Sequence, residues 1–173
     1  MGRLGSAHRG PGVSFVIRLQ KENFKFSCTH FTIFGAQQAE RLHGHNYYVR
    51  CEIEVDGVQD DLGLAFDFNV VKPEIKALCD ERDERILFPE RSPYLRISVE
   101  ERQTRVAFQT KEYLLPNEDV LKLPLVNITS EELARHFCHA LEARLAGKIK
   151  YRALAIEVEE TLGQSVKYRL CTS

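Results

Sequence analysis

Apolar and polar side chains alternate with a period of two along residues 42–55. One face of this stretch carries His43, His45, Tyr47, Val49, Cys51, Ile53 and Val55, and the other carries Asn46, Tyr48, Arg50, Glu52 and Glu54. Such alternation is typical of a half-buried β-strand. His43 and His45 therefore point to the same side, about 7 Å apart along the strand, where the apolar face ends. On spacing alone, such a pair is also typical of polar residues beside a loop.

Residues 23–31 alternate in the same way, and their apolar face also ends in a histidine. Phe24, Phe26, Cys28 and His30 share this face. If the two strands are neighbours, His30, His43 and His45 converge at one end of a sheet. Three neutral imidazoles with an open fourth position are the ligand set of a catalytic zinc site, whereas a structural site closes with a fourth protein ligand. Cys28 is a candidate for that fourth ligand, although we interpret it as a core residue.

Helical spacing predicts two helices. The first follows Asp67, a possible N-cap, carries Pro73 in an early turn and runs to about Arg82. The second begins at Thr129, where Glu132 completes a capping box. Its apolar stripe consists of Leu133, Phe137, Leu141 and Leu145, and Gly147 ends the helix.

Further alternation predicts strands at residues 14–20, 152–160 and 166–170. With the two strands above, they indicate an α+β domain over residues 13–173: a four-stranded antiparallel sheet with two helices on one face. Residues 94–128 read as an insertion with a β-hairpin, because alternating residues 95–99 and 104–108 flank a polar turn. Residues 1–12 are rich in glycine and arginine and are expected to form a flexible tail.

Composition narrows the class of protein. The 173 residues suit one domain, and the formal net charge of -1 gives no indication of a nucleic-acid or membrane surface. The sequence contains no apolar run long enough to span a membrane. Five cysteines without CxxC spacing indicate reduced thiols and a cytoplasmic location.

Two motifs in order carry a resemblance to a known family: Phe26-Ser27-Cys28-Thr29-His30 and His43-Gly44-His45-Asn46-Tyr47. With Asp67-Phe68, Asp83-Glu84-Arg85, Thr129-Ser130-Glu131 and Glu160-Thr161, the chain resembles the 6-pyruvoyl-tetrahydropterin synthase family, which includes the queuosine-pathway 6-carboxytetrahydropterin synthases. The resemblance implies a tunnelling fold and a Zn²⁺ ion held by His30, His43 and His45. It also implies a 7,8-dihydroneopterin triphosphate substrate and homo-oligomers, trimers or hexamers, with active sites between subunits.

The loop of residues 32–42 departs from the family, because it lacks the family's catalytic cysteine. Glu40 stands three residues before His43. A variant branch of the family, associated with folate synthesis, carries glutamate at this spacing. The resemblance therefore implies that Glu40 acts as a general base. The alternative is a solvated loop carboxylate.

A second departure lies after the first helix. Family members commonly have an Asp-His pair that shuttles protons, and this chain has Asp83 followed by Glu84. The resemblance implies that Asp83 and Glu84 assist catalysis as a carboxylate pair. Residues 82–85 are equally typical of an exposed charged turn.

The apolar face of residues 152–160 ends in Glu160. Two carboxylate oxygens match the parallel N–H groups on the edge of a pterin ring. The resemblance assigns Glu160 as the ring anchor and includes Thr129 among the substrate-binding residues; the alternative is a carboxylate at a strand end. His136 and His139 are interpreted as surface or interface residues.

These observations predict a zinc-dependent pterin synthase homologue. Three products stay open: 6-pyruvoyl-tetrahydropterin, 6-carboxytetrahydropterin and 6-hydroxymethyl-dihydropterin. The alternative is a zinc- and pterin-binding paralogue without catalysis, favoured by the replaced cysteine and histidine.

Overall fold

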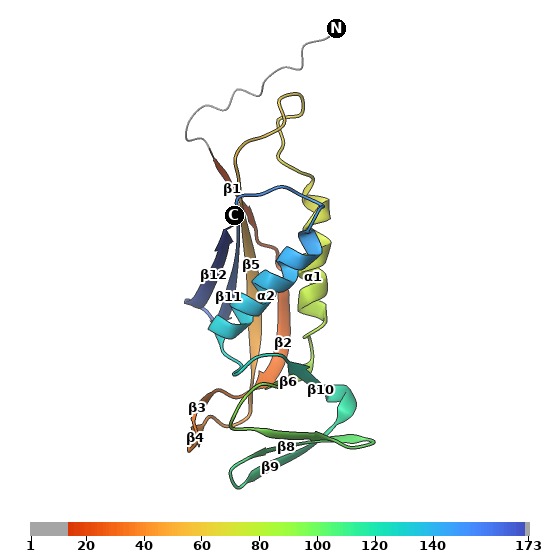
Figure 1. The fold of residues 1–173 in the computed structure, drawn as a ribbon, viewed down its shortest axis with the longest axis vertical. Coiled ribbons are helices and arrows are strands. Elements are labelled where there is room, and N and C mark those ends of the chain that lie inside the picture. The colour runs from red at the N-terminus through yellow and green to blue at the C-terminus, as the bar shows by residue number, and fades with distance from the viewer. Residues whose placement is uncertain (1–13, 172–173) are drawn as a thin grey trace.

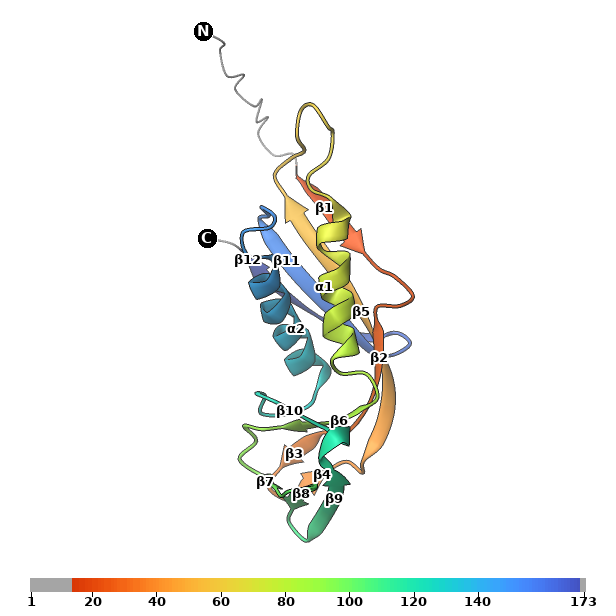
Figure 2. The same cartoon turned by 90° about the vertical axis from the view of Figure 1, so that its right-hand side faces the viewer.

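A computed structural model describes residues 14–171, in which a long twisted sheet lies against two helices (Figures 1 and 2). The expected tail of residues 1–12, including His8, lies outside the described residues. The strands of the main sheet are β1 (Phe15–Leu19), β2 (Lys25–His30), β5 (His43–Val55), β6 (Arg85–Pro89), β10 (Val120–Leu123), β11 (Ala153–Thr161) and β12 (Gln164–Cys171). Their order is β10-β6-β2-β5-β11-β12, and β1 pairs with β5 as well.

The long strand β5 is the centre of this sheet. Its first half pairs antiparallel with β2, which places His30 opposite His43 and Phe26 opposite Tyr47. Its second half pairs with β1, and its other edge pairs with β11. The predicted strands and their alternation are confirmed, because Tyr47, Val49, Cys51, Ile53 and Val55 are all buried. The two histidine-bearing strands are neighbours, as expected.

The expected four-stranded antiparallel sheet is too small, because the observed sheet has seven strands and mixed directions. Strand β6 runs parallel to both β2 and β10. Leu87 and Phe88 in β6 are buried in succession rather than in alternation. Parallel strands covered on both faces have such continuous apolar runs, and a run this short carries no period from which a strand can be predicted.

Helices α1 (Lys72–Asp80) and α2 (Ser130–Leu145) cover one face of the sheet (Figure 2). The cap of α2 is confirmed, because the Thr129 hydroxyl accepts a hydrogen bond of 3.3 Å from the Glu132 N–H. Its predicted stripe is fully buried at Leu133, Phe137, Leu141 and Leu145. Asp67 caps a short 3₁₀ turn, Phe68–Val70, instead of α1 itself, and α1 ends at Asp80, two residues before the predicted end.

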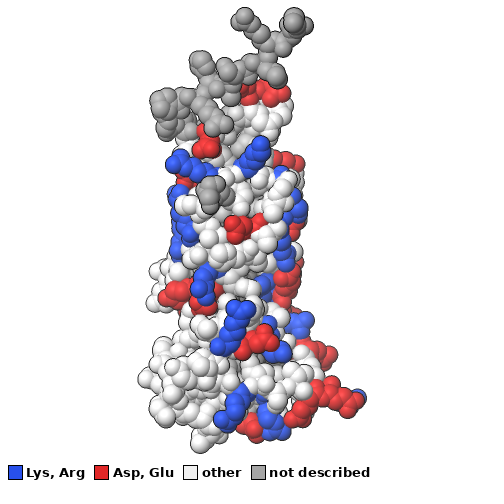
Figure 3. Space-filling model, in the orientation of Figure 1, with Lys and Arg blue, Asp and Glu red and all other residues white. Residues whose placement is uncertain are grey.

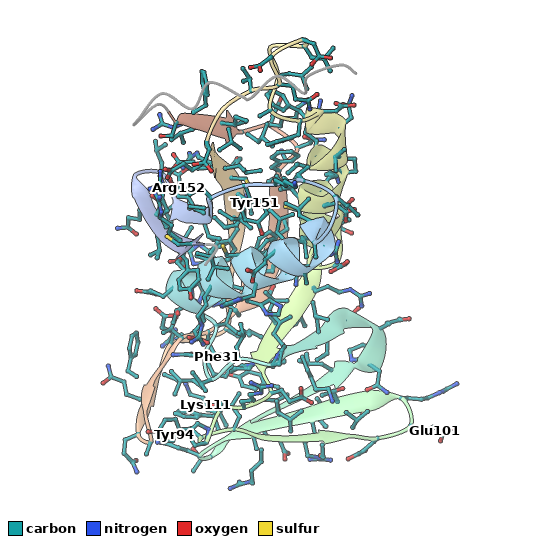
Figure 4. The ribbon with its side chains drawn as sticks, turned by 45° about the horizontal axis from the view of Figure 1, so that its top comes forward. Phe31, Tyr94, Glu101, Lys111, Tyr151 and Arg152 are labelled. Atoms are coloured by element: carbon teal, nitrogen blue, oxygen red, sulfur yellow. The ribbon has the colours of Figure 1, made fainter. Side chains whose placement is uncertain are left out.

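The insertion forms a separate sheet of three strands, β7 (Arg96–Val99), β8 (Gln103–Phe108) and β9 (Lys111–Pro116). The predicted hairpin forms its first two strands, and β9 is a third strand outside the two alternating stretches of the prediction. A 3₁₀ turn, Asn117–Asp119, leads from β9 into β10. Figure 4 shows Phe31 near this sheet, with Lys111 and Glu101 at its opposite ends. The Phe31 ring lies 5.9 Å from that of Tyr113 and 6.4 Å from that of Phe108.

The loop between β2 and β5 folds into a small hairpin, β3 (Ile33–Gly35) and β4 (Gln38–Ala39), beside the insertion (Figure 1). Gln109, in the turn between β8 and β9, donates hydrogen bonds to the Ala36 carbonyl and, over 3.1 Å, to the Gln37 side chain. The insertion therefore contacts the tip of the loop that carries Glu40.

The sheet face opposite the helices carries ion pairs that cross between strands. Lys167 pairs with Glu52 at 2.9 Å, and Arg50 pairs with Glu157 at 2.7 Å. On the face shown in Figure 3, charges of both signs are interspersed, and few lie around β3 and β4. No helix in residues 14–171 is long and apolar enough to cross a membrane. All five cysteines are free, and Cys171 alone among them is exposed.

Candidate active site

Three histidines from two strands meet at the end of the main sheet nearest the insertion. One ring nitrogen from each of His30, His43 and His45 lies within 4.8 Å of the other two, so the group could hold a metal ion. The ring centroids are 4.7 to 5.3 Å apart. His30 is fully buried, whereas His43 and His45 are partly exposed. The triad thus lies at the mouth of the core, as the strand pattern predicts.

Two of the rings are oriented by backbone carbonyls. The Nδ1 atom of His30 lies 3.2 Å from the Ile128 carbonyl oxygen, and that of His43 lies 2.7 Å from the Arg41 carbonyl oxygen. A carbonyl can only accept, so both Nδ1 atoms carry the proton and both Nε2 atoms present a lone pair. This arrangement is the usual outer support of metal-bound imidazoles. The donor set fits a divalent ion such as zinc.

The His30 ring is neutral. Its burial lowers the pKa below the ordinary value, and the nearby charge of Glu160, which acts in the opposite direction, does not reverse the shift. A neutral imidazole is the form that binds a metal.

A buried tyrosine connects the triad to Glu160. The Tyr47 hydroxyl donates a 2.6 Å hydrogen bond to Glu160 Oε1 and lies 3.0 Å from His30 Nε2. Glu160 Oε1 itself lies 3.4 Å from His30 Nε2 and 3.6 Å from His45 Nε2. Alternation along residues 42–55 puts Tyr47 on the face of His43 and His45, although the pattern assigns it no role. That shared face was the signal of its position.

Glu40 lies beside the triad. Its Oε2 atom accepts a 2.9 Å hydrogen bond from the Thr32 N–H and lies 4.0 Å from His43 Nε2. Partial burial acts to raise the pKa of the Glu40 carboxyl, but the Thr32 hydrogen bond and the adjacent His43 outweigh it, so the pKa is lowered. The carboxylate is therefore ionised at neutral pH.

Asp83 and Glu84 lie away from the triad. Asp83 Oδ1 accepts a 2.7 Å hydrogen bond from the Ser27 N–H. Glu84 lines a hollow of about 520 Å³ together with Ser27 and Asn46, whose side chains lie on the sheet face opposite the core. His45 borders this hollow, but within residues 14–171 no hydrogen bond or ion pair joins Asp83 or Glu84 to the three histidines.

The other candidate residues are placed as follows. Cys28 is buried, and its burial raises the pKa of the thiol to about 12, which suits a core residue. Thr129 is engaged as the cap of α2. The interpretation of His136 as a surface or interface residue is wrong in part, because the ring packs against buried Arg82, with His136 Nε2 3.1 Å from Arg82 Nη2. His139 is exposed and lies 3.5 Å from Glu142.

Comparison with known proteins identifies relatives along nearly the whole chain. The model of the family described as 6-pyruvoyl tetrahydropterin synthase matches residues 18–171. A protein of Methanocaldococcus jannaschii, named as a candidate 6-carboxy-5,6,7,8-tetrahydropterin synthase, is 30% identical over 148 residues, which is 84% of this chain and 89% of its own.

Two solved structures have the same fold. The 6-pyruvoyl tetrahydropterin synthase of Plasmodium falciparum has a TM-score of 0.86 at 25% identity, covering 93% of this chain and 100% of its own. A Plasmodium vivax 6-pyruvoyltetrahydropterin synthase variant, in which a catalytic glutamate is replaced by alanine, has a TM-score of 0.86 at 22% identity with the same coverage. At that identity the second similarity shows the fold alone.

Proposed function

Because the chain belongs to the 6-pyruvoyl tetrahydropterin synthase family, we propose that it is a zinc-dependent pterin synthase acting on 7,8-dihydroneopterin triphosphate. One observation carries the proposal: Glu40 and Glu160 converge on the histidine triad from two sides. A metal site flanked by two carboxylates suits proton abstraction from a hydroxylated side chain.

His30, His43 and His45 hold the zinc ion in this proposal. A bound zinc ion supplies Lewis acidity, which polarises the substrate hydroxyls and makes the adjacent C–H more acidic. The Ile128 and Arg41 carbonyls support this role, because they keep the Nε2 atoms of His30 and His43 free to coordinate.

Glu160 holds the pterin ring by its 2-amino group and N3–H. Support comes from the partial exposure of its side chain at the mouth of the site. Its Oε1 atom accepts from Tyr47, and no hydrogen bond reaches its Oε2 atom from any residue that the structure describes. Thr129 contributes a contact to the substrate, and support comes from its place next to Ile128, whose carbonyl orients His30.

Glu40 takes the proton from the substrate side chain. Its ionised carboxylate beside His43 supports this assignment. The Plasmodium vivax protein of the same fold has a catalytic glutamate, so the fold accommodates a catalytic carboxylate. The hydrogen bond from Thr32 makes Glu40 a weaker base, which increases its dependence on acidification of the substrate.

Asp83 and Glu84 assist from a neighbouring subunit. Their location on the far side of β2 supports this arrangement, since within residues 14–171 no hydrogen bond or ion pair joins them to the triad of their own chain. A homotrimer or hexamer would also cover β12, which lies at one edge of the sheet. Light scattering of the purified protein measures the assembly.

The relatives carry names for different products, 6-pyruvoyl- and 6-carboxytetrahydropterin, and Glu40 is the residue type of the folate-associated branch that forms 6-hydroxymethyl-dihydropterin. Incubation of the zinc-loaded protein with 7,8-dihydroneopterin triphosphate, followed by mass analysis of the pterins, tests the function and identifies the product. Binding of the substrate without any product would favour the alternative, a zinc- and pterin-binding paralogue.

A further inference from the structure

We propose that Glu160 is a fourth protein ligand of the metal while no substrate is bound, and that Tyr47 holds its carboxylate in that position. This inference rests on the metal site of the proposed function but not on turnover. It implies that the site is closed by the protein at rest and opens when the substrate hydroxyls displace Glu160.

The spacing of the donor atoms is the first argument. In a tetrahedral zinc site with bonds of about 2.0–2.1 Å, neighbouring ligand atoms lie roughly 3.3 Å apart. Glu160 Oε1 lies 3.4 Å from His30 Nε2 and 3.6 Å from His45 Nε2. These separations match two edges of such a tetrahedron. Within residues 14–171 no ion pair joins Glu160 to His43, so Glu160 Oε1 approaches the metal position from the side of His30 and His45.

The electrostatics of the contact are the second argument. The His30 proton is on Nδ1, where it is donated to Ile128, so His30 Nε2 faces the carboxylate with a lone pair. A lone pair and a carboxylate oxygen repel one another unless a cation lies between them. No hydrogen bond joins the His30 or His45 ring to Glu160 within the described part of the chain. The arrangement is therefore favourable with a metal ion among these atoms.

Tyr47 explains why Oε1 is the oxygen at the metal. The Tyr47 side chain is fully buried, and its hydroxyl has one charged acceptor, Glu160 Oε1, at 2.6 Å. A hydrogen bond from a rigid phenol to a carboxylate is short and strong. It fixes the rotation of the carboxylate and leaves Oε2 free. Tyr47 is thus a positioning residue, which acts on the metal through Glu160.

A matched control lies next in the sequence. The Glu159 side chain projects to the opposite face of β11, where it pairs with Arg50 and accepts a 2.9 Å hydrogen bond from the Gly163 N–H. The same substitution at Glu159 therefore changes the charge of the chain equally without touching the histidines.

The test measures metal binding by the full-length protein. Zinc affinity is determined by competition with a chromophoric chelator for the wild type, Glu160→Gln, Tyr47→Phe and Glu159→Gln. We expect Glu160→Gln to weaken zinc binding by at least about tenfold, Tyr47→Phe to weaken it less, and Glu159→Gln to leave it unchanged. Equal zinc affinity in the wild type and Glu160→Gln would overturn the proposal.

A second readout reports directly on the fourth position. Azide is titrated into the Co²⁺-substituted proteins, and its coordination is followed by the visible absorption of cobalt. Azide should bind Glu160→Gln at least about tenfold more tightly than the wild type, because no carboxylate competes. Equal azide binding would mean that the position is open in both proteins and would overturn the proposal.

A wild type that binds no zinc would overturn both this inference and the proposed function. A protein that gives these metal-binding results but is inactive would overturn the proposed function alone.

Discussion

Arg82 Nη2 lies 3.1 Å from Nε2 of His136, at the contact between the end of α1 and the first half of α2. Arg82 is only 4% exposed, and its guanidinium carbon lies 4.6 Å from the centroid of the Phe137 ring. His136 Nε2 must accept this hydrogen bond, so the ring is neutral. Burial and, after it, the charge of Arg82 lower the pKa of His136 to about 4.

This contact should make the protein less stable in mild acid. Histidine in the unfolded chain has a pKa of about 6.5, so between about pH 6.5 and pH 4 the unfolded state binds more protons and the free energy of unfolding falls as the pH falls. Above pH 6.5 His136 contributes no pH dependence to the free energy of unfolding. The loss between pH 7.5 and pH 5 should be no more than about 2 kcal/mol, since the ring is partly exposed. Urea unfolding at the two pH values measures it. His136→Gln keeps an acceptor for Arg82 without the titration, and an equal loss in that variant would contradict the assignment.

Zinc should be bound at about one ion per chain. His43→Ala and His45→Ala each remove one of three converging donors, so the purified variants should lose most of their zinc in metal analysis. His139→Ala is the matched control, because His139 is exposed on α2 and outside the triad. Full zinc occupancy in either triad variant would remove the basis of the proposed metal site.

The ring-anchor role of Glu160 can be separated from its metal role with a ligand that has no hydroxylated side chain. Glu160→Gln replaces one acceptor oxygen with a donor that opposes the ring N–H. The affinity for unsubstituted pterin should fall by about 1.5–3 kcal/mol, as for a hydrogen bond to a charged group. Titration calorimetry measures it, with Glu159→Gln as the control. An unchanged affinity would place the ring elsewhere in the site.

Glu40→Gln should reduce turnover by at least about 100-fold while zinc content and pterin affinity stay normal. The amide oxygen can still accept the hydrogen bond from Thr32, so the loop should keep its conformation while the base is lost. Product formation under single-turnover conditions measures the chemical step. If the variant has the same turnover rate as the wild type, Glu40 is not the base, and Asp83 and Glu84 become the candidates.

Gln109→Ala should loosen the loop that carries Glu40. The variant loses two hydrogen bonds to residues 36 and 37, worth about 1 kcal/mol each. Amide exchange in residues 34–39 should become faster and turnover should fall, with zinc affinity unchanged. Glu101→Ala, at the other end of the insertion sheet, is the control (Figure 4). Unaltered exchange in residues 34–39 would show that the insertion does not restrain the loop.

The elements with a clear period, and the side chains that share a face with their cores, are predictable from local patterns in the chain. Alternation placed His30, His43 and His45 at the ends of apolar faces, and the structure brings them together because β2 and β5 pair in register. The N-cap and stripe of α2 were predictable for the same reason, since caps and periodicity are local properties of the chain.

Features that depend on neighbours distant in sequence cannot be predicted in this way. The short runs of β6 and β10 have no period; β6 forms a strand because β2 offers an edge on which to pair, and β10 pairs in turn with β6. An exposed turn was one of two interpretations of the charged run at residues 82–85, yet Arg82 is buried against Phe137 while Asp83 bonds to the backbone of β2. The proximity of Tyr47, Glu160 and the triad likewise requires β11 to lie beside β5. Sequence patterns determine which face a side chain takes within a strand, whereas the pairing of strands determines which side chains meet.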